Sequence, residues 1–419
     1  MSLRFLLTAW GNPGNLNPLL TAARRLSQKG HHVRILGDAD HQEEITNAGF
    51  DALCWRRPAP LTLPGSVGED PAWSEICVLV RQIMFGQAID YAADTIDALR
   101  REPADAVLTN DFLLGPVIAA EAAGLPCALL SAHISIRPLE GVPIGGSGLM
   151  PGGSAEGQGE QASRSRLAEL MSGELPTLNH ARAAFGLKPL NHVFDHYDRA
   201  DRMLIGLSAA FDFPATRLPP NLRYVGPLLD LPAWTRPWKA PWSASPARPR
   251  VLVSLSTSFQ NQLGLLRRIV AALGTMALDA VVTTGPAMAH ETIDAPSNVT
   301  LVHSAPHDTV MKEVSLVVTH GGHGTVTRSL LNGLPLLVIP MGRDQADNAA
   351  RVVARGAGLS LIDGATEGEI VGAVARLLTE PQFQAAARRL GAAMATDLGS
   401  PVLVQEMETI AMQPWRRSA

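Results

Sequence analysis

The chain has 419 residues, of which 46% are hydrophobic and 18% are charged, and its formal net charge is −4. A chain of this length exceeds what one hydrophobic core usually organises, so we expect two domains. The small negative charge gives no general attraction to phosphate backbones, which excludes nucleic acid as an expected partner.

Cysteine usage and the N-terminus narrow the class of protein further. The three cysteines have no metal-type spacing and are odd in number, so neither a zinc site nor a disulfide framework is expected. The apolar run at the N-terminus is shorter than a signal peptide, and no stretch reaches the roughly 18 apolar residues of a membrane span. We therefore expect a cytoplasmic protein without integral membrane association, acting as a monomer or homodimer.

The first half of the chain alternates between expected strands and helices. A strand over 4–10 leads through a turn at 11–17 into a helix opened by Pro18 and closed near Gly30, and a strand follows over 32–36. This order is a βαβ unit, which is typical of an open parallel sheet. Further strand and helix signals follow at 106–108, 116–123 and 127–130.

A glycine-rich segment at 141–161 interrupts this alternation. Such a composition cannot build its own core, which predicts a mobile loop. Two interpretations stay open, a disordered insertion and a flap over a ligand site.

The second half of the chain repeats the pattern of the first. A segment rich in proline and tryptophan, 213–248, is typical of a semi-rigid linker. We therefore predict an α/β fold with two doubly wound Rossmann-like domains at 1–212 and 249–400, and we expect a last helix within 401–419 to pack back on the first domain. The supporting signals of the second half are a strand at 251–255, a helix at 263–273, a strand at 280–284, and later segments at 316–318, 325–331 and 335–339.

The most informative passage is 317–326, in which a strand runs into a glycine-rich turn and then into a helix. The first amide groups of a helix have no intrahelical partner and attract anions. Gly322 and Gly324 permit close approach of a ligand to the backbone, and His320 and Thr325 add side-chain donors. The passage predicts a phosphate site, whereas the alternative is a plain strand-to-helix turn with a satisfied histidine.

A second element follows the strand expected at 336–339. There the loop from Pro340 ends in Asp344 and Gln345, an adjacent carboxylate and amide that suit vicinal hydroxyls. Ligands of an open α/β domain bind at the carboxyl ends of strands, so this loop and the His320 turn can share one cleft. Together they favour a nucleotide-sugar site over a helix cap with a surface charge pair.

These motifs resemble the donor signature of the inverting GT-B glycosyltransferases, which include plant UDP-glycosyltransferases and bacterial antibiotic glycosyltransferases. The match rests on His320-Gly-Gly-His-Gly-Thr325, on Gly333-Leu-Pro335 and on Pro340-Met-Gly-Arg-Asp344-Gln345. The resemblance implies the GT-B fold, in which two Rossmann-like domains face a central cleft. It also implies transfer of a sugar from a nucleotide diphosphate to a hydrophobic or phenolic small-molecule acceptor, with no metal and no other cofactor.

The resemblance assigns the donor-binding positions to three groups, which hold the diphosphate, the sugar hydroxyls and the base. Ser304 stands where plant enzymes have a tryptophan that stacks on the base. The diphosphate positions are Ser256, Thr257, His320, Gly322, Gly324 and Thr325, the sugar positions are Asp344 and Gln345, and the base positions are Ser304 and Ala305.

One departure from the signature concerns the nucleotide. Plant enzymes place a glutamate eight residues after the signature histidine, where it holds the ribose hydroxyls, and this chain has Arg328 there. Arginine cannot accept hydrogen bonds, so the sequence favours a donor that does not rely on the 2′-hydroxyl, such as a dTDP-sugar. If Arg328 instead points into solvent, a UDP-sugar remains the alternative.

The second departure concerns the catalytic base. Members of the family usually carry a histidine where this chain has Asn15, and an asparagine cannot take up a proton near neutral pH. The family's partner aspartate is present as Asp111, which can serve directly or through water as the base, with Asn15 orienting it or the acceptor. Alternatively, another side chain such as His133 or Asp344 approaches the acceptor, or the acceptor is acidic or a carbon nucleophile. A capping role for Asp111 is the structural alternative.

Two other functions compete with glycosyl transfer. The loss of the usual base makes a catalytically silent nucleotide-sugar-binding partner of another transferase credible. A Rossmann oxidoreductase is disfavoured, because the first turn lacks the Gly-x-Gly-x-x-Gly spacing.

Overall fold

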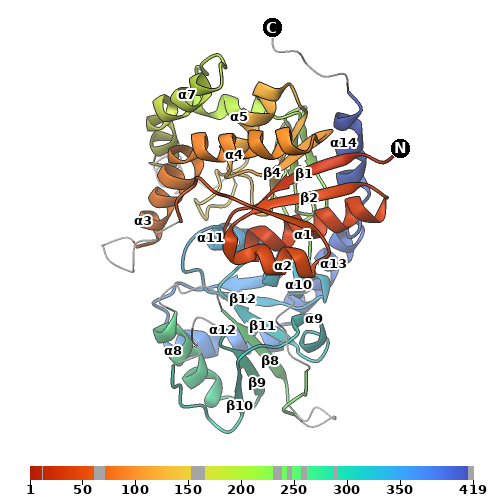
Figure 1. Cartoon of the computed structure of the whole chain (residues 1–419). Helices are drawn as coiled ribbons and strands as arrows, with labels where there is room; N and C mark the ends of the chain where they lie inside the picture. Colours follow the sequence, from red (N-terminus) through yellow and green to blue (C-terminus); the bar gives the residue numbers. More distant parts are fainter. Residues whose placement is uncertain are drawn as a thin grey trace.

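The computed structural model describes residues 1–11, 13–60, 71–151, 166–229, 238–242, 248–255, 262–285, 288 and 291–413. Two α/β domains lie one above the other, each built around a parallel sheet (Figure 1). This arrangement confirms the predicted fold class. The predicted donor positions Ser256 and Thr257, the segment 152–161 of the glycine-rich loop and parts of the predicted linker lie outside the described residues.

The first domain contains a seven-stranded parallel sheet in the order β3-β2-β1-β4-β5-β6-β7. Three of its strands, β1, β4 and β5, are almost entirely buried, as expected for strands covered by helices on both faces. The strands are β1 Arg4–Thr8, β2 His32–Gly37, β3 Asp51–Cys54, β4 Ala106–Asn110, β5 Cys127–Ser131, β6 Arg202–Ile205 and β7 Leu222–Tyr224.

The first helix of the first domain begins earlier than predicted. Helix α1 begins at Pro13, so the expectation that Pro18 opens it was wrong. Pro13 fills the first helical position, where a missing N–H does no harm, and Pro18 lies inside the helix. The shift moves Asn15 from the expected turn into the first turn of α1. The helices are α1 Pro13–Gln28, η1 Ala39–His41, α2 Gln42–Asn47, α3 Pro71–Val78, η2 Leu79–Gly86, α4 Ala88–Arg101, α5 Leu114–Ala123, α7 Leu175–Ala184 and η3 Val193–Asp198.

The second domain contains a six-stranded parallel sheet in the order β10-β9-β8-β11-β12-β13. In both sheets the strand order reverses beside the first strand of the domain, between β1 and β4 and between β8 and β11. The strands are β8 Arg250–Ser254, β9 Asp279–Thr283, β10 Val299–Val302, β11 Leu316–Thr319, β12 Leu336–Val338 and β13 Gly358–Ser360, and the helices are α8 Leu263–Gly274, α9 His307–Val310, α10 His323–Leu331, α11 Gln345–Ala354, α12 Glu367–Thr379 and α13 Pro381–Ala395.

The chain divides between the domains differently from the predicted boundary at 212. Strand β7, Leu222–Tyr224, pairs in parallel with β6 and extends the first sheet into the segment predicted as a linker. The strand is only three residues long, and the prolines around it mask its signal in the sequence. At the other end of the chain, helix α14 (Val402–Ala411) packs against α1, β4 and β6 of the first domain, and its Leu403 and Met407 are buried there.

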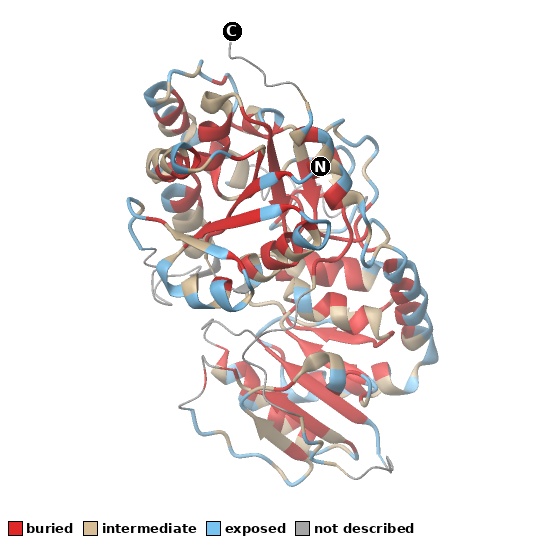
Figure 2. Ribbon diagram, turned by 45° about the vertical axis from the view of Figure 1, so that its right-hand side comes forward, coloured by how far each residue is buried: buried red, intermediate tan, exposed pale blue. Residues whose placement is uncertain are grey.

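The two domains share a buried interface. One apolar cluster includes Phe211 and Phe213 of the first domain together with Val326 and Val352 of the second. Figure 2 shows the buried strands at the centre of each domain and the exposed outer faces of the surrounding helices. The interface places the carboxyl ends of the two sheets opposite each other.

Within the described residues, no single helix has the length and apolar character needed to cross a membrane. Two consecutive helices, 73–86 and 88–101, are together long and apolar enough by length and composition only, and the chain bends by 46° between them.

Candidate functional site

A cavity of about 650 Å³ lies between the two domains. Its walls come from the segments that follow β1, β4 and β5 in the first domain and β8, β10, β11 and β12 in the second. These are carboxyl ends of parallel strands, and both points of reversed strand order open into the cavity. The cavity therefore lies where doubly wound domains bind their ligands.

The start of helix α10 forms one wall of the cavity. Gly322 is the N-cap residue, and no side chain caps the helix within the described part of the chain. Gly322, His323, Gly324 and Thr325 all line the cavity. The positive end of the helix dipole and its first amide groups therefore face the space that an anion would occupy.

His320 lies beside this helix end and also lines the cavity. One of its ring nitrogens donates a hydrogen bond to the carbonyl of Ser254, and burial lowers the pKa of His320 to about 4. The imidazole is therefore neutral at pH 7 in the absence of an anion. A Cβ on Gly322 would lie 2.6 Å from Nε2 of His320, so only glycine fits beside the ring.

Asp344 and Gln345 line the cavity at the start of helix α11. Oδ2 of Asp344 accepts a hydrogen bond from Asn348 at 3.0 Å, which fixes the carboxylate. The side-chain oxygen of Gln345 accepts from the amide of Met341 at 2.7 Å, and Gln345 is only 2% exposed. Asp344 thus faces the cavity with a fixed orientation, whereas Gln345 also braces the loop between β12 and α11.

Of the two residues predicted to bind the nucleobase, only one lies on the cavity wall. Ala305 lines the cavity, but Ser304 does not, and its buried Oγ has no hydrogen-bond partner among the described residues. Arg328 also lines the cavity, and its Nη1 lies 2.9 Å from each carboxylate oxygen of Asp308. Its side chain is 14% exposed, so the alternative in which Arg328 points into solvent was wrong.

The predicted catalytic residues lie on opposite sides of the cavity wall. Asn15 lines the cavity, whereas Asp111, which follows β4, is fully buried behind it. Oδ1 of Asp111 lies 3.1 Å from Nε2 of His133, which follows β5 and lines the cavity. Sequence reasoning named His133 only as an alternative base, and the structure pairs it with Asp111.

The pair of Asp111 and His133 determines the charge of the imidazole. Burial lowers the pKa of His133, but the charge and hydrogen bond of Asp111 outweigh it, and the pKa of His133 rises to about 9. Its Nδ1 donates to the carbonyl of Ile134 at 2.8 Å, so both ring nitrogens face acceptors. An imidazolium satisfies both contacts, which makes His133 a partly buried cation at pH 7.

The end of the cavity in the first domain is mostly apolar, and Asn15, Glu75 and His133 are polar residues on its wall. Its wall comes from α3, η2, the helix at 166–173 and the segments after β1, β4 and β5. Such a wall suits a flat or lipophilic molecule rather than a charged one. The apolar lining residues are Trp10, Ile76, Leu79, Val80, Met84, Phe112, Ile134, Ile136, Leu167 and Met171.

Two contacts across the cavity join the domains, and neither was predicted. Arg343, whose φ is +56°, donates from Nε and Nη2 to Oε1 of Glu75 at 2.9 and 2.6 Å. Asp347 accepts hydrogen bonds from the amides of Gly146 at 2.5 Å and Gly148 at 2.8 Å. The carboxylates of Glu75 and Asp347 both line the cavity. Their hydrogen-bond partners are 268 and about 200 residues away in the sequence, so no local sequence pattern predicts these contacts.

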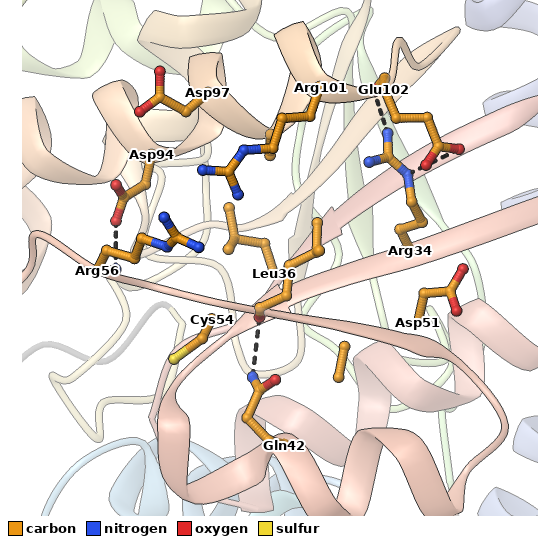
Figure 3. A pocket seen from close by; sticks show the side chains of 13 residues that line it. Arg34, Leu36, Gln42, Asp51, Cys54, Arg56, Asp94, Asp97, Arg101 and Glu102 are labelled. Atoms are coloured by element: carbon orange, nitrogen blue, oxygen red, sulfur yellow. Dashed lines mark hydrogen bonds and ion pairs between the residues drawn. The ribbon is translucent and has the colours of Figure 1, made fainter.

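A second hollow of about 560 Å³ lies on the first domain, between α4 and the strands β2 and β3 (Figure 3). Arg34 donates to the carbonyl of Glu102, and Asp94 accepts from the amide of Arg56 at 2.7 Å. No residue of this hollow lines the cavity between the domains. Acidic and basic side chains alternate around it, so it favours no ligand of one charge.

Comparison with known proteins identifies the class of enzyme. Residues 267–410 match the family described as "Erythromycin biosynthesis protein CIII-like, C-terminal domain". The chain is 28% identical over 405 residues to 4′-demethylrebeccamycin synthase of Lentzea aerocolonigenes, covering 93% of this chain and 95% of that protein. It is 27% identical over 450 residues to tylactone mycaminosyltransferase of Streptomyces fradiae, covering 97% and 92%.

Solved structures support the same fold. The glycosyltransferase of kitacinnamycin superposes with a TM-score of 0.78 at 19% identity, covering 98% of this chain and 99% of that one. The glycosyltransferase VinC, solved in complex with dTDP, superposes with a TM-score of 0.67 at 22% identity, covering 97% and 100%. The predicted resemblance to the bacterial antibiotic glycosyltransferases is confirmed, and the chain is a nucleotide-sugar glycosyltransferase with the GT-B fold.

Proposed function

We propose that this enzyme transfers a sugar from a dTDP-sugar to a hydrophobic, natural-product-like aglycone, with inversion and without a metal ion. The observation that carries the proposal is the division of the cavity into two unlike ends. The end in the second domain offers the start of α10, an imidazole and a fixed carboxylate, whereas the end in the first domain is mostly apolar. One end suits a diphosphate with its sugar, and the other suits the aglycone.

This arrangement supports the following reaction. The acceptor atom attacks the anomeric carbon on the face opposite the diphosphate, the bond from that carbon to the phosphate oxygen breaks, and the configuration inverts. The first amides of α10 stabilise the negative charge of the departing nucleotide diphosphate, and His320 lies beside them on the cavity wall. We assign the proton of the acceptor to Asp111 through a water molecule, because Asp111 lies behind the cavity wall.

Two observations support dTDP over UDP. Arg328 occupies the position of the ribose-binding glutamate, and both oxygens of its partner Asp308 already accept from it. A 2′-hydroxyl that donates a hydrogen bond finds no free carboxylate in this pair. In addition, one relative is named "TDP-daunosamine transferase DnrS" and is 25% identical over 447 residues.

Isothermal titration with dTDP and UDP tests the donor side. We expect dTDP to bind more tightly than UDP, and His320→Ala to weaken dTDP binding at least tenfold, since a charge-assisted hydrogen bond contributes about 1.5–3 kcal/mol. His180→Ala is the matched control, because His180 is exposed on α7 and does not line the cavity. Tighter binding of UDP would reject the preference, and no binding of either nucleotide would reject the proposed donor site.

A further inference from the structure

We infer that Glu75 is a positioning residue for the donor sugar, which acts through Arg343 on the orientation of Asp344. The inference deepens the proposed function and rests on its assignment of Asp344 to the sugar hydroxyls. Glu75 lies on α3, in the wall of the acceptor end, whereas Arg343 directly precedes Asp344 in the loop between β12 and α11. A residue of the acceptor wall therefore controls how the sugar is held.

The contact between Glu75 and Arg343 crosses the cavity from one domain to the other. Nε and Nη2 of Arg343 both donate to Oε1 of Glu75, at 2.9 and 2.6 Å. Both residues line the cavity, and their side chains are only 18% exposed for Glu75 and 25% exposed for Arg343. Two charge-assisted hydrogen bonds with limited access of water are stronger than an exposed ion pair, so this contact holds the guanidinium in one place.

The backbone of Arg343 indicates that the loop depends on contacts from outside it. Its φ is +56°, and no other non-glycine residue in the described part of the chain has a positive φ. Residues with a side chain adopt this conformation at a cost in free energy, and they cluster at active sites and ligand clamps. The two hydrogen bonds to Glu75 help to offset this cost and to keep the shape of the loop.

The carboxylate of Asp344 is held from both domains. Within the second domain, its Oδ2 accepts a hydrogen bond from Asn348 at 3.0 Å. From the first domain, Glu75 holds the residue that precedes Asp344 and binds the cation of that residue. If Glu75 loses its charge, the guanidinium of Arg343 loses this partner, and Asp344 is the acid next to it in the chain. A contact between Arg343 and Asp344 would then compete with the sugar hydroxyls for the carboxylate.

The diphosphate is a second destination for an Arg343 side chain that has lost Glu75. Burial lowers the pKa of His320, and the charge of Arg343 lowers it further, so the guanidinium lies within electrostatic reach of the phosphate wall. A move of Arg343 to the diphosphate would strengthen the binding of dTDP itself. Positioning through Asp344 changes only the contribution of the sugar, so binding measurements separate the two effects.

Isothermal titration of the whole chain with dTDP and with dTDP-glucose measures the contribution of the sugar as the ratio of the two dissociation constants. Glu75→Gln keeps the size of the side chain but removes its charge. We expect this variant to bind dTDP-glucose at least about fivefold more weakly than the parent, the lower end of an ordinary coupling between two groups. Its dissociation constant for dTDP should stay unchanged, which also shows that the variant is folded.

Glu121→Gln is the matched control. Glu121 accepts hydrogen bonds from Nη1 and Nη2 of Arg182 at 2.7 and 2.9 Å, and its side chain is 25% exposed. Neither residue lines the cavity, so this substitution should leave both dissociation constants unchanged. The same loss of dTDP-glucose binding in Glu121→Gln as in Glu75→Gln would overturn the inference.

Arg343→Gln and the double variant test whether Glu75 acts through Arg343. Each single substitution breaks the same contact, so the double variant should lose no more affinity for dTDP-glucose than Glu75→Gln alone. Losses that add would mean that Glu75 acts on the sugar independently of Arg343, which would overturn the inference. Arg343→Gln also breaks the contact from the second domain if Glu75→Gln does not fold.

Failure of this inference differs from failure of the proposed function, and Asp344→Ala separates the two. If Asp344→Ala lowers the contribution of the sugar and Glu75→Gln does not, Asp344 holds the sugar and the role of Glu75 alone is rejected. If Asp344→Ala leaves that contribution unchanged, the assignment of Asp344 fails and the inference fails with it. Tighter binding of dTDP to Glu75→Gln would reject the inference, since Arg343 would then act on the diphosphate.

Discussion

Asp347 connects the two domains at the rim of the cavity, and its substitution by asparagine gives a measurable pH effect. Its carboxylate accepts the amides of Gly146 and Gly148 across the interface, and the residue is 2% exposed. Burial raises the pKa of Asp347 to about 6 against the opposing effects of the two amides and of Arg351. Asparagine keeps the size of the side chain but does not titrate.

The direction of the effect follows from proton binding. Because the pKa of Asp347 is above its ordinary value of 3.8, the folded chain binds this proton more tightly than the unfolded chain. The resulting stability is fully present below pH 3.8 and is lost as the pH rises through about 6. The shift corresponds to about 3 kcal/mol, of which about 2 kcal/mol falls between pH 7.5 and pH 4.5.

Urea unfolding of the parent and of Asp347→Asn at both pH values measures this difference. On going from pH 7.5 to pH 4.5, the parent should gain about 2 kcal/mol in free energy of unfolding relative to the variant. Asp294→Asn is the matched control, since Asp294 is an exposed carboxylate of the second domain and should show no such change. A difference between parent and Asp347→Asn that stays constant with pH, or that grows toward pH 7.5, would refute the reasoning.

Three further predictions concern the interface, the nucleotide and the metal. Gly148 has a φ of +65°, and a Cβ at this position would lie 2.7 Å from Cβ of Ala346. Gly148→Ala should therefore destabilise the fold by at least about 1–2 kcal/mol in thermal unfolding. Gly173→Ala is the control, because Gly173 lies on a helix with open space around it and its substitution should not destabilise the fold. Arg328→Glu combined with Asp308→Asn should raise the affinity for UDP relative to dTDP by titration, and an unchanged ratio would exclude this pair as the determinant. Treatment with EDTA should leave kcat/KM within experimental error of its original value, and a loss restored by added Mg²⁺ would contradict the proposed mechanism.

Most of the fold could be predicted because its signals are local. The strands of both sheets are short apolar runs, and the expected βαβ units at 4–36 and 251–284 match β1-α1-β2 and β8-α8-β9. The start of α1 was misplaced because two prolines five residues apart both fit a first helical turn, and propensity alone does not choose between them. Strand β7 was missed because three residues carry too little periodicity.

The donor end of the cavity could be predicted better than the catalytic end. His320, Gly324, Thr325 and Asp344 lie within one stretch of sequence, so their spacing already indicates a shared site, and the structure places all four on the cavity wall. The contact of Asp111 with a histidine 22 residues later depends on the pairing of β4 with β5, which sets the two strand ends side by side. The spacing of Asp111 and His133 in the sequence does not predict that contact.

The contacts around helix α11 connect the donor end of the cavity to the acceptor end. Asp344 faces the predicted sugar site, and three residues later Asp347 holds the first part of the glycine-rich loop, whose Gly146 lines the cavity. One further turn along the helix, Arg351 donates from Nε to Asp212 of the first domain at 2.8 Å, and both residues are at most 2% exposed. A ligand that shifts the start of α11 must therefore also shift the wall of the acceptor end, because buried ion pairs and amide contacts do not stretch without breaking. Donor and acceptor should then bind cooperatively, with the coupling passing through Asp347.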